Sequence, residues 1–113
     1  MKPFNIYTKR SESYHFKSAN PKWGSYSLIY TRSDHQGKHT PFKHSIDLEV
    51  FGDIPGGDED DMVLFLNISK YDREKSHISK GRRRLPKDLL TKFGGLPARV
   101  KNLLKESGLV SRL

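Results

Sequence analysis

Cysteine is absent from this chain of 113 residues, and so is any long apolar run. Without Cys the chain has no disulfide framework, no thiolate nucleophile and no Cys-ligated zinc, which favours a reducing compartment. No apolar stretch approaches the roughly 18 to 20 residues that span a bilayer, and the first residues lack the apolar core of a signal peptide. We therefore expect a cytoplasmic protein with no membrane partner.

The chain also lacks the motifs of the common nucleotide-dependent and acyl-transfer enzymes. Its glycines fit neither the G-x-G-x-x-G nor the Walker spacing that cradles phosphate, and no Ser stands in a G-x-S-x-G elbow. The five His residues form no zinc-finger or His-Glu-x-x-His pattern. The sequence therefore predicts no cofactor and no bound metal, and it favours a protein that is not an enzyme.

Charge, in contrast, is plentiful and unevenly distributed. Seven of the 13 acidic residues lie between Ile46 and Asp61, a block with no Lys or Arg, so the other 97 residues hold all 21 basic residues and six acids. Lys and Arg neutralise phosphates and release counterions, so a field of this sign predicts nucleic acid as the partner. The block ends in the carboxylates of Asp58, Glu59, Asp60 and Asp61, which stay hydrated and offer a possible contact to a basic protein partner.

The first 70 residues have the alternating pattern of short strands. Four segments show it: 4–8, 13–17, 25–31 and 46–50. A fifth segment, 62–68, is nearly all apolar, as expected of a strand that is covered on both faces. We expect a turn at 9–12 between the first two segments and an exposed loop at 32–41, which has no aliphatic or aromatic residue. The last two segments, joined by the turn-rich Pro55-Gly56-Gly57, predict a hairpin.

The last third of the chain has the pattern of two helices. Residues 70–84 hold little to bury, so we expect a basic linker there. Pro86 and Pro97 each begin a segment with apolar residues at helical spacing, and Gly94-Gly95 and Gly108 supply the stops.

These elements predict a single α+β domain, because strands precede helices. Its expected parts are a β-rich part at 1–69, the linker at 70–84 and a two-helix part at 85–113. The sheet is expected to be antiparallel and curved, or a small barrel, with about five strands.

Aromatic and basic side chains interleave in the N-terminal third, the composition of single-strand-binding surfaces, where rings stack on bases and cations hold phosphates. Most rings in a small β domain belong to the core. Trp23, in a loop context, and Tyr7, on the strand face opposite Ile6, are expected outside it. The predicted nucleic-acid-binding residues are Lys9, Arg10, Lys17, Lys22, Trp23, Arg32, Lys80, Arg82, Arg83 and Arg84. No recognition helix is evident, so the expected ligand is single-stranded nucleic acid or RNA, bound with weak sequence specificity.

Two other functions stay open. His39 and His44 have carboxylates nearby in the sequence, and such a His can serve as the general base of a metal-independent ribonuclease. The other alternative is a protein-interaction or inhibitor module that engages its target through the acidic hairpin 46–61 or through an exposed sheet edge.

Overall fold

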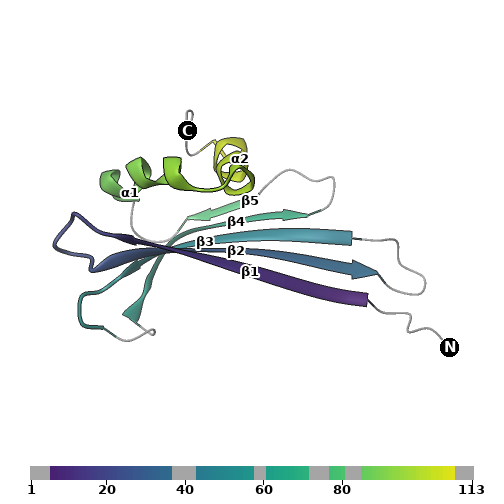
Figure 1. The fold of residues 1–113 in the computed structure, drawn as a ribbon, viewed down its shortest axis with the longest axis horizontal. Helices are drawn as coiled ribbons and strands as arrows, with labels where there is room; N and C mark the ends of the chain where they lie inside the picture. The colour runs from purple at the N-terminus through teal and green to yellow at the C-terminus, as the bar shows by residue number, and fades with distance from the viewer. Residues whose placement is uncertain (1–5, 37–42, 58–60, 72–76, 81–84, 109–113) are drawn as a thin grey trace.

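The computed structural model describes residues 6–36, 43–57, 61–71, 77–80 and 85–108 (Figure 1). One antiparallel sheet contains β1 (Ile6–Lys17), β2 (Ser25–Gln36), β3 (Lys43–Asp53), β4 (Val63–Tyr71) and β5 (His77–Lys80), arranged in chain order. The helices α1 (Lys87–Lys92), η2 (Phe93–Gly95, a 3-10 turn) and α2 (Ala98–Glu106) follow. The predicted α+β order is confirmed. The sheet is curved but open, with β1 and the short β5 at its two edges, so the barrel alternative is wrong.

The strands β1 and β2 are longer than the sequence pattern indicates. Residues 9–12 continue β1 instead of turning, and residues 32–36 extend β2 instead of forming a loop. Both predictions are wrong for the same reason: a polar run makes ladder hydrogen bonds like any other once a partner strand lies beside it. Here Arg10 stands directly opposite Arg32. The rest of the predicted loop, 37–41, lies outside the described residues.

The predicted linker at 70–84 is also partly wrong. Lys70 and Tyr71 end β4, and His77–Lys80 form β5 beside it. Ile78 supplies the apolar contact that the polar composition conceals, because it stands opposite Ile68 and packs against the core. The segments 72–76 and 81–84 lie outside the described residues.

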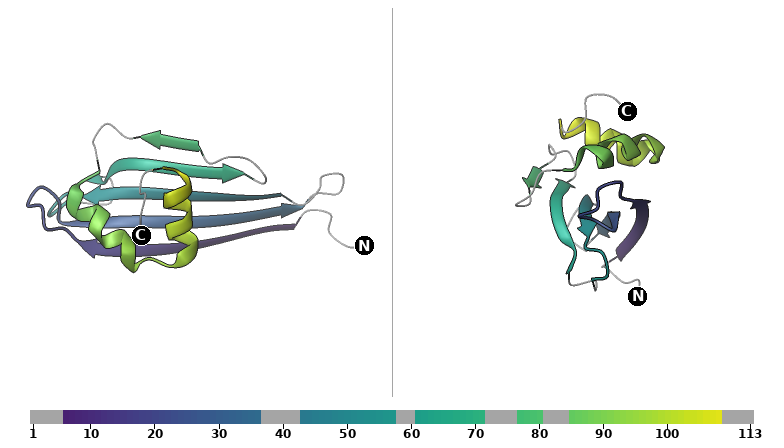
Figure 2. Two further views of the ribbon diagram at one scale, coloured as in Figure 1. Left: turned by 90° about the horizontal axis from the view of Figure 1, so that it is seen from above. Right: turned by 90° about the vertical axis from the view of Figure 1, so that its left-hand side faces the viewer.

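Both helices cover the same face of the sheet (Figure 2). Strand alternation places Tyr26, Leu28 and Tyr30 of β2 on that face, as predicted, and all three are buried. The predicted apolar stripes of the helices meet them. The buried helical side chains are Leu89, Phe93, Val100, Leu103 and Leu104. Gly108 follows the C-terminus of α2. Its φ of 81° is the left-handed conformation expected of a glycine that ends a helix.

A bulge in β4 determines where Trp23 lies. Val50 pairs with Leu66 but the next residue of β3 pairs with Leu64, so Phe65 is an extra residue, and it turns into the core. Its ring stands edge-on to Trp23, with centroids 5.2 Å apart. A Cβ on Gly52 would lie 2.6 Å from the Phe65 ring, so only glycine leaves room for this pair.

The expectation that Trp23 lies outside the core is therefore wrong. Trp23 is 5% exposed, because the turn between β1 and β2 places its ring against Gly52, where a larger residue would leave no room. The Trp23 amide donates to the carbonyl of Asn20 within that turn.

Polar contacts fix the helices on the sheet. Asp88 of α1 accepts hydrogen bonds from the Tyr26 hydroxyl, at 2.7 Å, and from the Ala19 amide, at 2.9 Å. The helix α2 crosses the strands, with Arg99 bonded to Glu12 of β1. At its other end Glu106 accepts from Lys70 of β4 at 2.8 Å.

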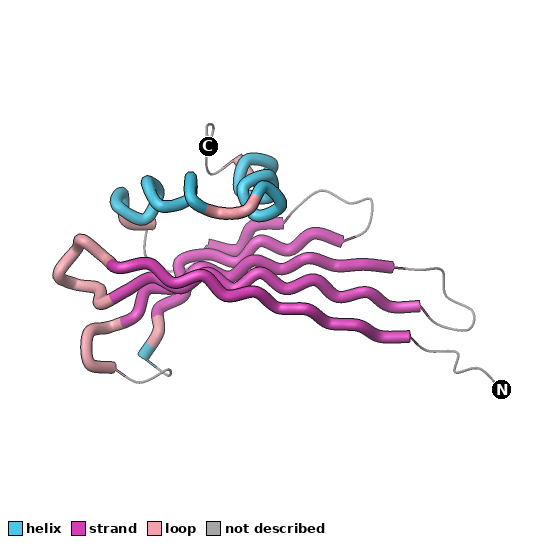
Figure 3. Tube along the Cα trace, in the orientation of Figure 1, coloured by secondary structure: helices cyan, strands magenta, loops and turns pink. Residues whose placement is uncertain are grey.

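The strands continue past α2 as a projection that no described helix covers (Figures 1 and 3). We call this projection the arm. It consists of residues 6–10 of β1, 32–36 of β2, 43–46 of β3 and Tyr71 of β4.

Candidate nucleic-acid interface

Strand alternation sorts the side chains of the arm onto two faces. We call the face of the sheet opposite the helices the open face, because neither helix covers it. On the arm, the open face carries Tyr7, Lys9, His35, Lys43 and Tyr71. The other face of the arm carries Thr8, Arg10, Arg32, Asp34 and His44.

Two exposed aromatic rings lie on the open face of the arm. Tyr7 is 63% exposed and Tyr71 is 54% exposed. Lys9, Ser33, Ser45 and Tyr71 stand opposite one another in a row across the four strands, and Tyr7 lies two residues beyond Lys9 on β1. Three strand spacings separate the two rings across the sheet, about 14 Å, so each can take a different base of one strand. The expectation that Tyr7 lies outside the core is confirmed.

Between these rings the open face is low and polar. Serines fill the two positions between Tyr71 and Lys9 in this row, because Ser45 is the direct partner of Tyr71 and Ser33 stands opposite Ser45. One row nearer the helices, the hydroxyls of Ser11 and Thr31 are hydrogen-bonded at 3.1 Å. The partner of Tyr71 is thus a small side chain, whereas the partner of Tyr7 on this face is His35. Both rings remain more than half exposed and accessible to a base.

The arm is basic on balance. Its described residues include four cations, Lys9, Arg10, Arg32 and Lys43, and one carboxylate, Asp34. Arg32 and Asp34 form an ion pair at 3.3 Å. Like charges directly opposite each other cost stability, so the Arg10 and Arg32 pair is a feature that folding alone does not favour.

The rest of the open face carries carboxylates. Asp47 accepts from the Ser69 hydroxyl at 2.7 Å, and Asp53 accepts from Ser25 at 2.6 Å and from Ser27 at 3.0 Å. Such an arrangement repels a phosphate backbone from the centre of the sheet and favours the arm.

The predicted binding residues do not all come together. Lys9, Arg10 and Arg32 meet on the arm, whereas Lys17 lies eight residues along β1 from Lys9, about 27 Å away. Lys22 is at the same far end, with its ammonium 5.7 Å from the centre of the buried Trp23 ring.

The other predicted residues bear less on this surface. Lys80 ends β5, and Asp61 is exposed after the β3–β4 turn. Arg82, Arg83, Arg84, Asp58, Glu59, Asp60 and His39 lie outside the described residues. A protein partner for the acidic hairpin 46–61 stays a prediction.

Sequence reasoning missed three residues of the arm: His35, Lys43 and Tyr71. Each continues the alternation of a predicted strand beyond the boundary that the apolar pattern suggests. For Tyr71 the sequence contained a usable signal. Tyr71 lies two residues after Ser69, so strand alternation places both on one face of β4, opposite the face that carries the buried Ile68.

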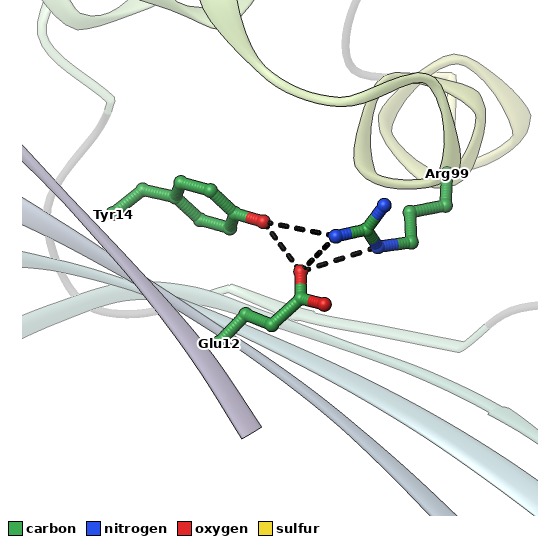
Figure 4. Close-up of polar contacts among 3 residues, drawn as sticks. All are labelled: Glu12, Tyr14 and Arg99. Atoms are coloured by element: carbon green, nitrogen blue, oxygen red, sulfur yellow. Dashed lines mark hydrogen bonds and ion pairs between the residues drawn. The ribbon is translucent and has the colours of Figure 1, made fainter. Parts of the chain in front are cut away.

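A polar cluster marks the base of the arm (Figure 4). One carboxylate oxygen of Glu12, Oε2, accepts from both the Arg99 guanidinium and the Tyr14 hydroxyl. Those bonds, the one from Arg99 first, hold the pKa of Glu12 below its ordinary value, and donation to the carboxylate raises the pKa of Tyr14. The second oxygen of Glu12, Oε1, accepts no hydrogen bond from Arg99 or Tyr14 (Figure 4).

Within the described residues no helix combines the length and apolar character needed to cross a membrane, and no three His, Asp or Glu side chains are grouped to hold a metal ion. No protein-family model matches the chain, and neither curated proteins nor solved structures give a significant match.

Proposed function

We propose that the protein binds single-stranded nucleic acid on the open face of the arm. The observation that carries the proposal is the placement of Tyr7 and Tyr71, both exposed, on one face with Lys9 and Lys43. Aromatic rings stack on bases and the neighbouring ammonium groups contact phosphates, the combination that single-strand-binding surfaces use.

The expected affinity has two parts. Stacking on each ring contributes about 1 to 3 kcal/mol and tolerates every base. Each phosphate neutralised by a lysine adds about 0.7 to the slope of log affinity against log salt for a single strand. Binding is therefore weakly sequence-specific and strongly salt-dependent.

A single strand suits this surface better than a duplex does. Bases in a duplex are stacked on each other and hide their faces, whereas unpaired bases can turn out onto protein rings. The open face presents rings and small hydroxyls, and it has no helix to enter a major groove.

Titration of a labelled twelve-nucleotide single strand at several salt concentrations tests the proposal. The double variant Lys9→Gln/Lys43→Gln is expected to bind more weakly, with a salt slope smaller by about 1.4. Its control, Lys87→Gln/Lys105→Gln, removes the same charge from the helices, where both lysines are exposed. Equal loss of affinity in both variants, or no binding by the unaltered protein in dilute buffer, contradicts the proposal.

One further placement favours RNA cleavage as a second candidate function. His44 stands directly opposite Asp34, which is ion-paired to Arg32. A His beside a carboxylate can remove the proton of a 2′-hydroxyl, and the nearby guanidiniums can stabilise the charge that develops on the attacked phosphate. Incubation of the protein and of a His44→Ala variant with labelled RNA tests this function. Intact RNA after long incubation with the unaltered protein rules it out.

A further inference from the structure

The strand β1 is an edge of the sheet along all twelve of its residues. It pairs with β2 on one side, and no described strand pairs with its other side. The turn between η2 and α2 projects past this edge, but it lies in the helix layer and not in the plane of the sheet (Figure 2). Such an edge presents backbone N–H and C=O groups that another strand can bind. We propose that two copies of this chain pair through β1, antiparallel, about a twofold axis at Ser11.

The charges of β1 select this register. A twofold axis requires that residues of the same face stand opposite each other. With the axis at Ser11, Arg10 faces the partner's Glu12 and Glu12 faces the partner's Arg10. Moving the axis to Arg10 or to Glu12 places like charges against each other, and moving it to Ser13 places Lys9 opposite the partner's Lys17.

The groups that would form the new ion pair are available in the single chain. Arg10 is exposed and makes no hydrogen bond or ion pair with a described residue. The Oε1 oxygen of Glu12 accepts no hydrogen bond from Arg99 or Tyr14, because both contact Oε2 (Figure 4). Glu12 keeps 40% of its side chain exposed. The partner's Arg10 would arrive at this second oxygen.

The pairing also changes the nucleic-acid surface, an extension that rests on the proposed function. Tyr7 would face the partner's His15, and the partner's Lys17 would be its diagonal neighbour on the open face, about 7 to 8 Å away. Lys17, which is remote from Lys9 in one chain, thus joins the arm of the other chain. The two open faces become one continuous surface with the arms pointing in opposite directions.

Disulfide formation tests the register, because the natural chain has no Cys. With the axis at position 11, the Cα atoms of that residue pair lie about 4.5 or 5.5 Å apart, within the range that a disulfide spans. A Ser11→Cys variant is expected to cross-link on mild oxidation. The matched Ser13→Cys variant is not, because its two thiols would be displaced by about 14 Å. Cross-linking of Ser13→Cys in preference to Ser11→Cys overturns the register.

Charge reversal tests the interface itself, by sedimentation or light scattering without nucleic acid. Arg10→Glu and Glu12→Arg each place like charges in both ion pairs, so each alone is expected to dimerise about tenfold or more weakly than the unaltered chain. Mixed together they restore both pairs, and heterodimers are expected. Circular dichroism verifies that each variant is folded. Arg10→Glu is the safer of the two, because Arg10 makes no hydrogen bond or ion pair with a described residue, whereas Glu12 is bonded to Arg99 and Tyr14.

A monomeric unaltered chain at high concentration, or a mixture no more dimeric than its components, overturns the dimer. These results are independent of the oligonucleotide titration. A dimer that binds no single strand contradicts the proposed function and leaves the pairing intact. A monomer that binds a single strand contradicts the pairing and leaves the proposed function intact.

Discussion

The helix-covered part of the sheet and the arm are built from the same strands with the same alternation. On the side of the sheet that faces the helices, however, the covered part carries apolar side chains and the arm carries charged ones. On β2 the helix-side positions read Tyr26, Leu28 and Tyr30 under the helices and then Arg32 and Asp34 on the arm. The backbone register does not change between them, because β1 and β2 pair without a break. A sheet can therefore extend well beyond its core, provided that its strands stay paired.

This difference separates the residues that stabilise the fold from those of the proposed binding surface. Burial of apolar side chains drives folding, and the buried side chains of the described residues lie in the covered part. The arm has exposed rings and unbalanced cations instead, which contribute little to folding and are the groups that the proposed polyanion contact requires. Substitutions in the two parts should consequently change different measurements.

The largest expected effect is a loss of stability from the covered part. Phe65→Ala removes a ring that is 2% exposed and packs edge-on against Trp23 and Tyr26. We expect the free energy of unfolding to fall by about 3 to 5 kcal/mol, measured by urea denaturation. Tyr71→Ala, the control from the arm, should change it by less than about 0.5 kcal/mol. Comparable losses in both variants would mean that the arm is part of the cooperative core.

The reverse pattern is expected in nucleic-acid binding. Tyr7→Ala and Tyr71→Ala each remove a stacking surface, so each should weaken single-strand affinity by about 1 to 3 kcal/mol, or roughly 5- to 150-fold. Fluorescence anisotropy of a labelled oligonucleotide measures this. Ile54→Ala serves as the control, because Ile54 is also an exposed apolar residue but follows β3 at the other end of the sheet. Unchanged affinity in both tyrosine variants would exclude stacking on these rings.

The covered part was largely predictable from the sequence, since apolar periodicity is informative where one face is buried. The β3–β4 hairpin, the stripe of β2 and both helices follow from it. Trp23 shows the limit of this reasoning. Its local sequence is that of a loop, and the space that accepts it is made by Gly52 and Phe65, which are distant in the chain.

The arm was not predictable in the same way. Its strands are polar on both faces, so periodicity in apolar residues ends where the helices end, and residues 9–12 and 32–36 resemble a turn and a loop. The cations were identifiable one by one. Their grouping depended on a register that places Arg10 opposite Arg32 and Lys9 in the row of Tyr71, which only the paired sheet reveals.

Acid should weaken the attachment of α1 to the sheet, because Asp88 accepts the hydrogen bond of the Tyr26 hydroxyl. Burial raises the pKa of Asp88, but hydrogen bonds from Tyr26 and the Ala19 amide outweigh it and leave that pKa below its ordinary 3.8. A carboxyl whose pKa is lower in the folded state contributes stability above its unfolded pKa and loses it as the pH falls through the folded value. Below about pH 4, therefore, the unaltered protein should lose stability more steeply than Asp88→Asn. Parallel pH profiles of the two proteins in thermal unfolding would contradict this assignment.

The smallest expected effect comes from the boundary between the two parts, where Lys70 of β4 donates to Glu106 of α2. Both side chains are partly exposed, so Glu106→Gln should lower the free energy of unfolding by less than about 1 kcal/mol, and less still in high salt. The substitution also releases a positive charge beside the arm, but Lys70 is paired with Ile46 on the helix side of the sheet. If nucleic acid lies on the open face, single-strand affinity should stay nearly constant. A clear gain in affinity would instead place the ligand on the face that carries Arg10 and Arg32, and the assignment of the two faces of the arm would have to be exchanged.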